Sequence, residues 1–446
     1  MRCTALLILL ASIVAGPVGG TTYTLMPDGT GDFPTIQTAL DAVLDGDIIE
    51  LTDGTYSGAG NRDVEFLGKA VTVRSQTGDP EACIIDCGGT ASEFHRGFIF
   101  SSGESSATIL DGVTVTNGFS DLGGGLYCVL WSSPTISNCR IIANTISESG
   151  IGGGGIACIH GSSPLLIQCI IADNAAPTGV GGGVLDSYGT PTFAECTFSG
   201  NWSDEAGGGI FCSGSVGYLE NCTLAGNAAQ AGGGLYCEAQ AVIELTNTIV
   251  AFGNEGEAAA CDSLSTIVLS CSDLYGNIGG DWVGCVEDQL GLAGNISEDP
   301  LFCGLESGDF HLQDDSPCGP FSPPNPECDL IGAWPVGCET GTGVTPGMHT
   351  SVLDWQLGLS PNPCTGLTHI TCSVPSPLVG ATPNLGIYDA AGRLMRTFSL
   401  DTQVVGTVSL RWDGTDETGA AVPSGRYYCR LRGINDSPGI ALILVR

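Results

Sequence analysis

Carboxylates are the side chains of this chain that could do chemistry. Hydrolysis of a polysaccharide needs two of them, one acting as acid and one as base, and Asp173, Asp186, Asp204 and Glu205 could supply such a pair. Asp173, Asp204 and Glu205 fall in loops between expected strands, where acidic side chains are usually solvated. We therefore expect no catalytic residue among the four, and a carboxylate pair remains the alternative.

Asp186 differs from the other acids because it stands where most repeats of this chain have a cysteine. If that position faces the interior, an acid there is costly unless it is hydrogen-bonded, and it would mark a metal or catalytic site. A local shift that turns Asp186 outward avoids the cost. We expect the outward position.

Histidines and glycines indicate no metal or cofactor site. His160 has no second histidine or carboxylate at ligand spacing, so zinc is not expected, and His95 beside Arg96 fits a capped strand edge. Acids and loop carbonyls are plentiful enough for calcium, but no loop has a recognised ligand pattern. The glycine triplets lack the Gly-Lys-Ser/Thr ending of a phosphate-binding loop. We expect no catalytic, cofactor-binding or metal-binding residue, and no cofactor.

Aromatic residues are the better candidates for contact with a ligand. Tyr127 and Tyr236 follow a glycine triplet at the same distance, and Phe211 occupies that position between them; Trp131 and Trp202 are the other two candidates. An outward aromatic column suits stacking on sugars or packing against a protein partner. The alternative is ordinary stacking between neighbouring repeats that stiffens a sheet.

The elements that must position these side chains are sequence repeats. Five glycine triplets, each followed by an aliphatic residue, recur with their third glycines 30, 28, 26 and 25 residues apart. A repeat of this length means stacked units, each too small to bury its own apolar face. The repeated positions are the triplets ending at Gly125, Gly155, Gly183, Gly209 and Gly234, a first column of Cys128, Cys158, Asp186, Cys212 and Cys237, a second column of Cys139, Cys169, Cys196, Cys222 and Asn247, and the asparagines Asn144, Asn174, Asn201 and Asn227.

These columns predict an all-β fold, a right-handed parallel β-helix in which each repeat forms one coil. Side chains two residues apart on a strand share a face, and equivalent residues of successive coils stack about 4.8 Å apart. Right-handedness follows from the crossover rule for parallel strands, and stacked asparagines can bond amide to amide along the axis. The cysteine columns allow two interpretations: bridges between adjacent coils (Cys128–Cys158, Cys212–Cys237, Cys139–Cys169 and Cys196–Cys222) or buried thiols.

The domain boundaries follow from changes in pattern along the chain. Residues 1–20 read as a secretory signal peptide, with Arg2 before an apolar stretch, and its removal takes Cys3 and leaves 20 of the 21 cysteines. The β-helix with both caps spans 21–338; residues 35–44 have the spacing of an amphipathic cap helix, and 299–338 form a cap held by bridges among Cys303, Cys318, Cys328 and Cys338. A linker follows at 339–358. Residues 359–446 read as a small antiparallel Ig-like β-sandwich.

Charge excludes one class of partner. The chain has 13 basic and 48 acidic residues, a formal charge of −35, with no lysine or arginine between Arg140 and Arg393. Nucleic-acid binding needs phosphate neutralisation and is therefore excluded. Anionic membranes and polyanionic glycans would be repelled unless a cation bridged them. No transmembrane segment is expected in the mature chain.

Three motifs of the first 338 residues resemble known families. The glycine-triplet repeat with Phe198-Ser199-Gly200-Asn201 resembles the repeats of chlamydial polymorphic outer-membrane proteins, which form a β-helix. The segment from Asp28 to Gln37 looks like the opening of pectin methylesterases, but the aspartates and arginine that such esterases need have no match in the central coils. The segments 299–302, 308–312 and 330–333 are similar to the closing part of bacterial right-handed β-helix repeat proteins.

The tail carries a further resemblance. Ser360-Pro361-Asn362-Pro363, Trp412-Asp413-Gly414 and Val422-Pro423-Ser424-Gly425 resemble the Ig-like domain of the flagellar hook-capping protein and the C-terminal sorting domain (type A) of type IX secretion cargo. The resemblance implies export by an outer-membrane secretion machinery of a Gram-negative-type bacterium, to the cell surface or medium. We expect a non-enzymatic protein for adhesion or for binding a polysaccharide or protein; the alternative is a carbohydrate-active hydrolase or lyase.

Overall fold

The computed structural model of the chain describes residues 20–338 and, beyond them, 356–360, 368–374, 384–389, 393–399, 406–423, 425–432 and 439–444. The chain divides into two compact units near residue 340. The expected signal peptide up to residue 19 and most of the expected linker lie outside the described residues.

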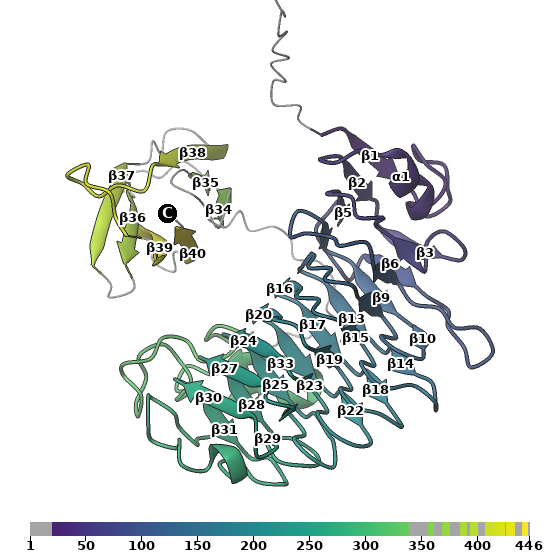
Figure 1. Ribbon diagram of the computed structural model, residues 1–446. Helices are drawn as coiled ribbons and strands as arrows, with labels where there is room; N and C mark the ends of the chain where they lie inside the picture. The colour runs from purple at the N-terminus through teal and green to yellow at the C-terminus, as the bar shows by residue number, and fades with distance from the viewer. Residues whose placement is uncertain are drawn as a thin grey trace, which may run out of the picture. The chain divides into compact units, whose positions relative to one another are not determined.

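The first unit is a parallel β-helix whose strands stack into three long sheets and one short sheet (Figure 1). Strand pairs of successive coils are parallel and in register, as the repeats predict. The first sheet holds β1 (Thr22–Leu25), β2 (Ile48–Leu51), β5 (Thr72–Ser75), β8 (Ile109–Asp111), β12 (Thr135–Ser137), β16 (Leu165–Ile167), β20 (Thr192–Ala194), β24 (Val216–Glu220), β27 (Val242–Thr246) and β30 (Thr266–Ser270).

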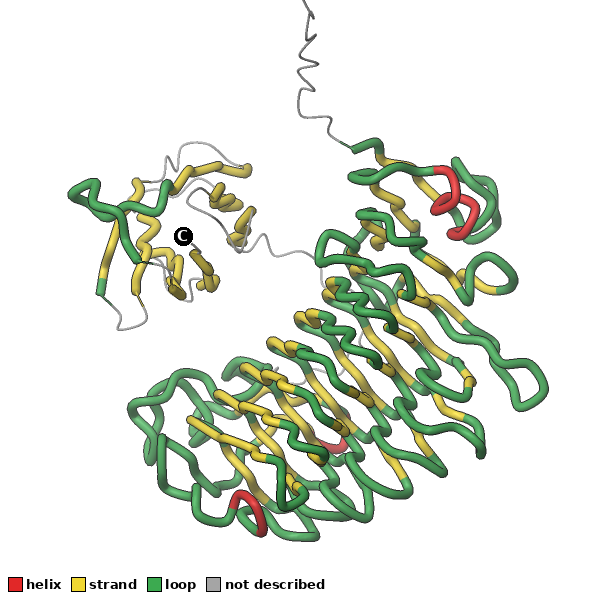
Figure 2. The backbone as a smooth tube through the Cα atoms, viewed as in Figure 1, coloured by secondary structure: helices red, strands yellow, loops and turns green. Residues whose placement is uncertain are grey.

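The other sheets run beside the first along the same axis (Figure 2). The second sheet holds β3 (Gly54–Ser57), β6 (Cys83–Asp86), β9 (Thr114–Thr116), β13 (Arg140–Ile142), β17 (Ile170–Ala172), β21 (Thr197–Ser199), β25 (Thr223–Ala225), β28 (Ile249–Ala251) and β31 (Asp273–Tyr275). The third holds β4 (Val64–Glu65), β7 (Phe98–Phe100), β11 (Leu126–Cys128), β15 (Ile156–Cys158), β19 (Val184–Ser187), β23 (Ile210–Ser213), β26 (Leu235–Glu238) and β29 (Ala259–Cys261). The short fourth sheet holds β10 (Phe119–Ser120), β14 (Thr145–Ile146), β18 (Ala175–Ala176) and β22 (Trp202–Ser203).

The glycine triplets let neighbouring coils approach where the chain turns into the third sheet. Gly153 has a φ of +68°, a left-handed conformation that glycine adopts without strain. A Cβ on Gly154 would lie 2.4 Å from the carbonyl oxygen of Gly182 in the next coil. Any larger residue at that position would push the two coils apart.

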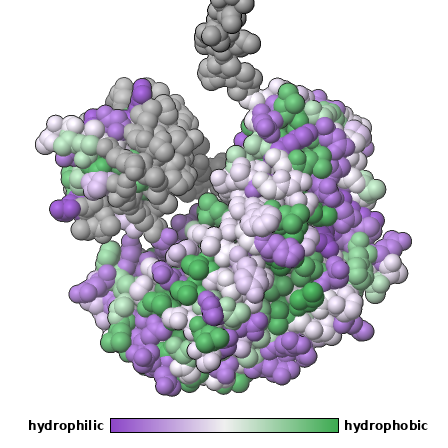
Figure 3. All heavy atoms as spheres, in the orientation of Figure 1, coloured by the Kyte–Doolittle hydropathy of each residue, from purple (hydrophilic) through white to green (hydrophobic). Residues whose placement is uncertain are grey.

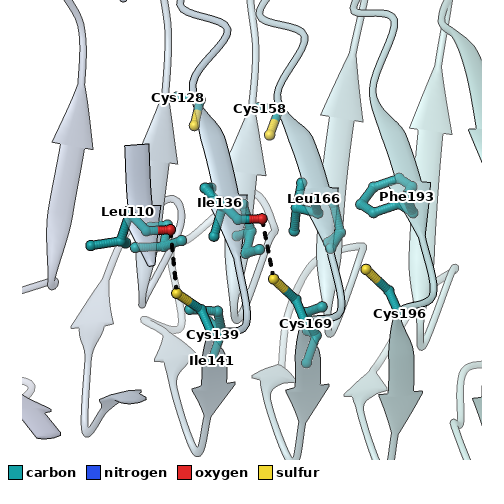
Figure 4. Packing of buried hydrophobic residues seen from close by; sticks show 14 of the residues in the cluster. Leu110, Cys128, Ile136, Cys139, Ile141, Cys158, Leu166, Cys169, Phe193 and Cys196 are labelled. Atoms are coloured by element: carbon teal, nitrogen blue, oxygen red, sulfur yellow. Dashed lines mark hydrogen bonds between the residues drawn. The ribbon is translucent and has the colours of Figure 1, made fainter. Parts of the chain in front are cut away.

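The cysteine columns face the interior as a ladder of thiols (Figure 4). Cys128 pairs in register with Cys158, and the thiols of Cys139 and Cys169 donate to the carbonyl oxygens of Leu110 (3.6 Å) and Ile136 (3.4 Å). All eight cysteines of the two columns are buried and unbridged. Of the two interpretations that the spacing allows, the structure therefore has buried thiols, which pack as small apolar side chains.

The asparagine ladder is confirmed. The side-chain nitrogen of Asn144 donates to Oδ1 of Asn174 (3.1 Å), and the same bond joins Asn174 to Asn201 and Asn201 to Asn227 (3.0 Å each). Each Oδ1 also accepts the backbone N–H of the asparagine one coil before, at 3.0 to 3.1 Å. These amides are buried, so the ladder satisfies polar groups that would otherwise lose their hydrogen bonds with water.

A short helix covers the N-terminal end of the coils, as the apolar spacing predicts. The helix α1 spans Ile36–Ala42, and Thr35 and Thr38 form a reciprocal capping box at its start. Lys69, the only lysine of the sequence, donates to the carbonyl oxygens of Leu40, Asp41 (3.2 Å) and Val43 (2.9 Å). Its charge thus satisfies the carbonyls at the end of the helix.

The C-terminal cap is held by bridges, one of which ties it to the helix. Cys303 bonds to Cys338 within the cap, and Cys328 bonds to Cys271 of the last coils, while Cys318 is free. A further bridge joins Cys261 to Cys285. The cap contains β32 (Phe302–Gly304), β33 (Asp309–Leu312) and the short helix η2 (Leu305–Ser307), and the short helix η1 (Gly284–Val286) precedes it.

The end of this cap runs back over the second sheet. The indole N–H of Trp334 donates to Oγ1 of Thr197 (2.7 Å), and the backbone N–H of Ala333 donates to Oγ1 of Thr223 (3.0 Å). The cap therefore contacts coils whose residues lie more than a hundred positions earlier.

The second unit is a small antiparallel β domain, as expected for an Ig-like module. One sheet has the order β34 (Gln356–Ser360), β35 (Thr368–Val374), β38 (Gly406–Trp412), and the other has the order β37 (Leu394–Ser399), β36 (Asn384–Asp389), β39 (Gly425–Arg432), β40 (Gly439–Leu444). Its core is built around the buried Trp412, whose ring meets Tyr427 edge to face.

Candidate functional site

A groove lies over the outer face of the third sheet. Its floor is the outward column of that sheet, in which Ala157, Leu185, Phe211 and Tyr236 follow one another in register. The rings of Phe211 and Tyr236 stack with centroids 5.6 Å apart and planes 12° apart. The interior is filled by the opposite face of these strands, and Leu185 and Phe211 form a second, smaller apolar cluster with the wall residue Ala206.

Loops form the walls of the groove. One wall consists of the segments that precede each glycine triplet, with Leu122, Ile151, Val180, Ala206 and Ala231, and the other of the turns that follow the strands, with Ile159, His160 and Tyr188. The groove is open to solvent and has a volume of about 660 Å³. Apolar side chains form several separate patches on the visible face of this unit (Figure 3).

The first of these walls is also where the repeats change length. From ladder asparagine to the first glycine of the next triplet there are 9, 7, 6 and 5 residue steps in successive coils, whereas from triplet to asparagine there are 21, 21, 20 and 20. The strands and turns of the remaining coil are therefore nearly constant, and the wall takes up the difference.

Two acidic side chains stand among the polar residues of the groove. Glu205 and Glu238 both line it, and the Ser213 hydroxyl donates to a carboxylate oxygen of Glu238 (3.3 Å). No lysine or arginine lies in the sequence between Arg140 and Arg393 to offset them. The groove therefore presents apolar and aromatic surface beside negative charge, which disfavours polyanionic ligands.

The four aromatic residues singled out from the sequence have different positions. Tyr236 lines the groove with Phe211. Tyr127 lies beneath the guanidinium of Arg96, 4.8 Å from the ring centroid, and does not line the groove. Trp131 is on the turn after β11 and is 73 % exposed, whereas Trp202 belongs to the fourth sheet and is 38 % exposed.

The expectation for Asp186 is wrong: the residue faces the interior. It pairs in register with Cys158 on one side and Cys212 on the other, and it is completely buried. The inward register of β19 is set by Val184, so turning Asp186 outward would also turn out this core residue.

The carboxylate of Asp186 lacks the partners that a buried charge needs. Neither oxygen has a hydrogen-bond partner of good geometry. Burial raises its pKa to about 7, and the Ser215 hydroxyl and Gly189 amide are close enough only to temper the rise. At pH values below about 7 the side chain is therefore neutral in the folded protein.

The structure does not bring the four acids of the sequence hypothesis together. Asp186 is inside the helix, whereas Asp173, Asp204 and Glu205 are exposed outside it. Of these three, only Glu205 lines the groove, opposite a residue that the sequence did not single out, Glu238. In the described part of the chain, no three histidine, cysteine or acidic side chains cluster closely enough to hold a metal ion.

Sequence reasoning also missed Tyr188 and Asp273. Tyr188 follows Asp186 by two residues, the same offset that places His160 after Cys158, and this offset was the available signal. Asp273 is buried under the C-terminal cap, where the Cys318 thiol donates to it (3.3 Å) and burial raises its pKa to about 7.

Comparison with solved structures finds matches of low sequence identity. A crystal structure of pectate lyase Pel9A is 16 % identical, with 71 % of this chain and 96 % of that chain covered and a TM-score of 0.44. Pectin methylesterase from carrot is 12 % identical, with 66 % and 94 % covered and a TM-score of 0.37. Deglycosylated pectin methylesterase from Aspergillus niger is 12 % identical, with 63 % and 95 % covered and a TM-score of 0.35.

Comparison with protein families covers both units. No curated protein matches the chain. Within the described residues, no helix has the length and apolar character needed to cross a membrane. The model of the FlgD Ig-like domain matches residues 370–437, and that of the right handed beta helix region matches residues 49–274. With half of its length inside the latter model and every coil stacked in parallel register, the chain belongs to the right-handed β-helix family.

Proposed function

We propose that this protein is exported and binds a polysaccharide in the groove over its third sheet, without catalysing a reaction on it. The observation that carries the proposal is the groove over the outward column of Leu185, Phe211 and Tyr236. Between its two loop walls the partly exposed Tyr236 offers aromatic surface, while Leu185 and Phe211 are buried beside it. Sugars have apolar C–H faces that stack on aromatic rings, and carboxylates such as Glu238 accept bonds from their hydroxyl groups. The alternative is a protein ligand, and the binding test must be able to detect it.

Export and surface attachment are proposed on the second unit. The match of residues 370–437 to the FlgD Ig-like domain supports this role. Deleting residues 359–446 in an outer-membrane-bearing host should keep the protein inside the cell, while the full chain reaches the surface or medium. Unchanged export of the shortened chain, measured by cell fractionation, would contradict this part of the proposal.

The binding test uses the full mature chain on a glycan array, followed by titration calorimetry with each hit. Tyr236→Ala should weaken binding, and Tyr127→Ala, a tyrosine of the same column outside the groove, is the matched control. Binding that is insensitive to Tyr236→Ala would contradict a polysaccharide ligand in the groove. So would an array without hits if the chain instead binds a defined protein.

A carbohydrate-active enzyme is the second candidate, favoured by one observation: Glu205 and Glu238 line the same groove. If the protein is a hydrolase, reducing ends accumulate during incubation with the bound polysaccharide, and Glu205→Gln and Glu238→Gln each abolish them. If it only binds, reducing ends stay constant while binding persists.

A further inference from the structure

Two exposed aromatic side chains stand on the turns that follow the strands of the third sheet. Trp131 follows β11 and is 73 % exposed, and Tyr188 follows β19 and is 67 % exposed. They belong to coils that are two steps apart, because β15 lies between β11 and β19. Neither ring belongs to a buried apolar cluster of the described residues.

Each ring rests on a glycine of the next coil. A Cβ on Gly161 would lie 2.7 Å from Cδ1 of Trp131, and a Cβ on Gly214 would lie 2.6 Å from Cε1 of Tyr188. With any larger residue at these two glycines, the rings would have to lift away. The glycines thus leave room for each ring to lie against backbone on one side and face solvent on the other.

Folding does not explain these large side chains. Trp131 and Tyr188 have φ values of +61° and +59°, a region that costs a bulky residue free energy and that glycine occupies freely. At the same offset after the strand, the coil before Tyr188 has His160 (φ +53°) and the coil after it has Gly214 (φ +63°). Because the rings bury little apolar surface, they do not repay this cost in the folded chain.

The spacing of the rings is set by the coils. The backbone N–H of Trp131 donates to the carbonyl oxygen of His160 (3.3 Å), so the turns are bonded from coil to coil like the strands. Two steps of about 4.8 Å place the two ring positions about 10 Å apart along the axis. This separation is close to the length of one disaccharide in an extended β-1,4-linked chain, in which every second sugar presents the same face.

We propose that Trp131 and Tyr188 form a stacking platform for an extended, uncharged, β-linked polysaccharide that runs along the helix axis. The inference rests on the proposed function, and it names the ligand class and orientation. Tyr188 also lines the groove, so platform and groove form one continuous surface. Glu205 and Glu238 line this surface, and the sequence has no lysine or arginine between Arg140 and Arg393, so the charge selects against polyanionic chains.

The test measures the affinity of the full mature chain for neutral β-1,4-linked oligosaccharides of two to six sugars, with oligogalacturonate as the anionic comparison. A chain must reach both rings to gain from both, so tetrasaccharides and longer chains should bind about 3- to 10-fold more tightly than disaccharides. Trp131→Ala and Tyr188→Ala should each weaken hexasaccharide binding about 3- to 10-fold. Trp202→Ala, an exposed tryptophan on the fourth sheet, should leave it unchanged.

A double variant tests the spacing itself. Trp131→His with His160→Trp keeps the composition but puts the rings one coil apart, so it should bind no better than Trp131→Ala. Glycan binding that is lost in Tyr236→Ala but kept in Trp131→Ala and Tyr188→Ala overturns the platform and leaves the proposed function standing. Tighter binding of oligogalacturonate than of neutral chains also overturns it, and no glycan binding at all overturns both. Unchanged thermal unfolding shows that each variant is folded.

Discussion

Asp186 lies in strand register with Cys212, one coil away, so that a carboxyl group occupies a place in the interior column that a thiol fills on the next coil. Cys158 fills the same place on the coil before. A single buried acid in a thiol column is a local cost in stability, and its size depends on pH.

Replacing Asp186 by cysteine should stabilise the protein at neutral pH and above. The pKa of Asp186 is about 7 in the folded state against 3.8 for the ordinary group. Between these values the folded protein holds a proton that the unfolded chain has lost, so stability falls as pH rises through this window. The fall is at most on the order of 4 kcal/mol.

Denaturant unfolding of both proteins at pH 4 and pH 8 measures this effect. Asp186→Cys should gain a few kcal/mol at pH 8 and much less at pH 4. Asp273 titrates in the same direction but is present in both proteins, so the difference between them isolates Asp186. An equal gain at both pH values would show that the carboxyl does not titrate in this range.

Asn201→Ala should destabilise the first unit by about 2 to 4 kcal/mol. The change removes the bonds from Asn201 to Asn227 and to the carbonyl oxygen of Ile171 (2.8 Å), and it leaves the buried N–H of Asn174 without its acceptor. Asn254→Ala, which removes an exposed amide, is the control. Equal losses in chemical unfolding of the two variants would contradict a structural role for the ladder.

The cysteine columns should stay unreactive in the native protein. Burial raises the pKa of thiols such as Cys139 and Cys196, which keeps them protonated and out of reach of alkylating reagents. Iodoacetamide should label the eight column cysteines only after unfolding. Non-reducing peptide mapping that finds Cys128 joined to Cys158 would contradict the thiol ladder.

Removing the bridge between Cys303 and Cys338 should loosen the C-terminal cap and leave the central coils intact. The bridge closes a loop with a sequence separation of 35 residues, for which chain entropy gives a stabilisation of about 3 to 4 kcal/mol. With both cysteines changed to serine, hydrogen exchange should increase in residues 299–338. Equal exchange in the cap and in β12 to β24 after the change would contradict this separation.

The coils could be predicted because their signals are local and repeated. The Asn144 to Asn227 spacing and the alternation of Leu126 with Cys128 fix register in every repeat, and the structure confirms both. The outward position predicted for Asp186 is wrong because the prediction considered only the desolvation cost of that one side chain. The register of a coil is a property of all its strands, and Val184 and the paired coils outweigh one costly side chain.

The candidate site was predicted only in part. Phe211 and Tyr236 belong to the repeat and could be placed. Ile151 and Glu238 line the groove together, although one precedes a triplet and the other ends a strand. Spacing alone does not show how far a loop folds over a sheet. Cysteine spacing likewise fits bridged and free thiols equally, because adjacent coils place two cysteines at the same backbone distance in either case.

The wall whose length changes from coil to coil has a consequence for how such proteins diversify. The number of residues from each triplet to the next asparagine is nearly constant, so the strands, the amide ladder and the thiol columns stay in register. Residues can therefore be gained or lost between an asparagine and the next triplet without disturbing any other coil. That segment borders the groove through Ile151, Val180 and Glu205. Descendants of one ancestral rod could thus acquire new recognition properties by insertion and deletion at a single side, at little expense to folding.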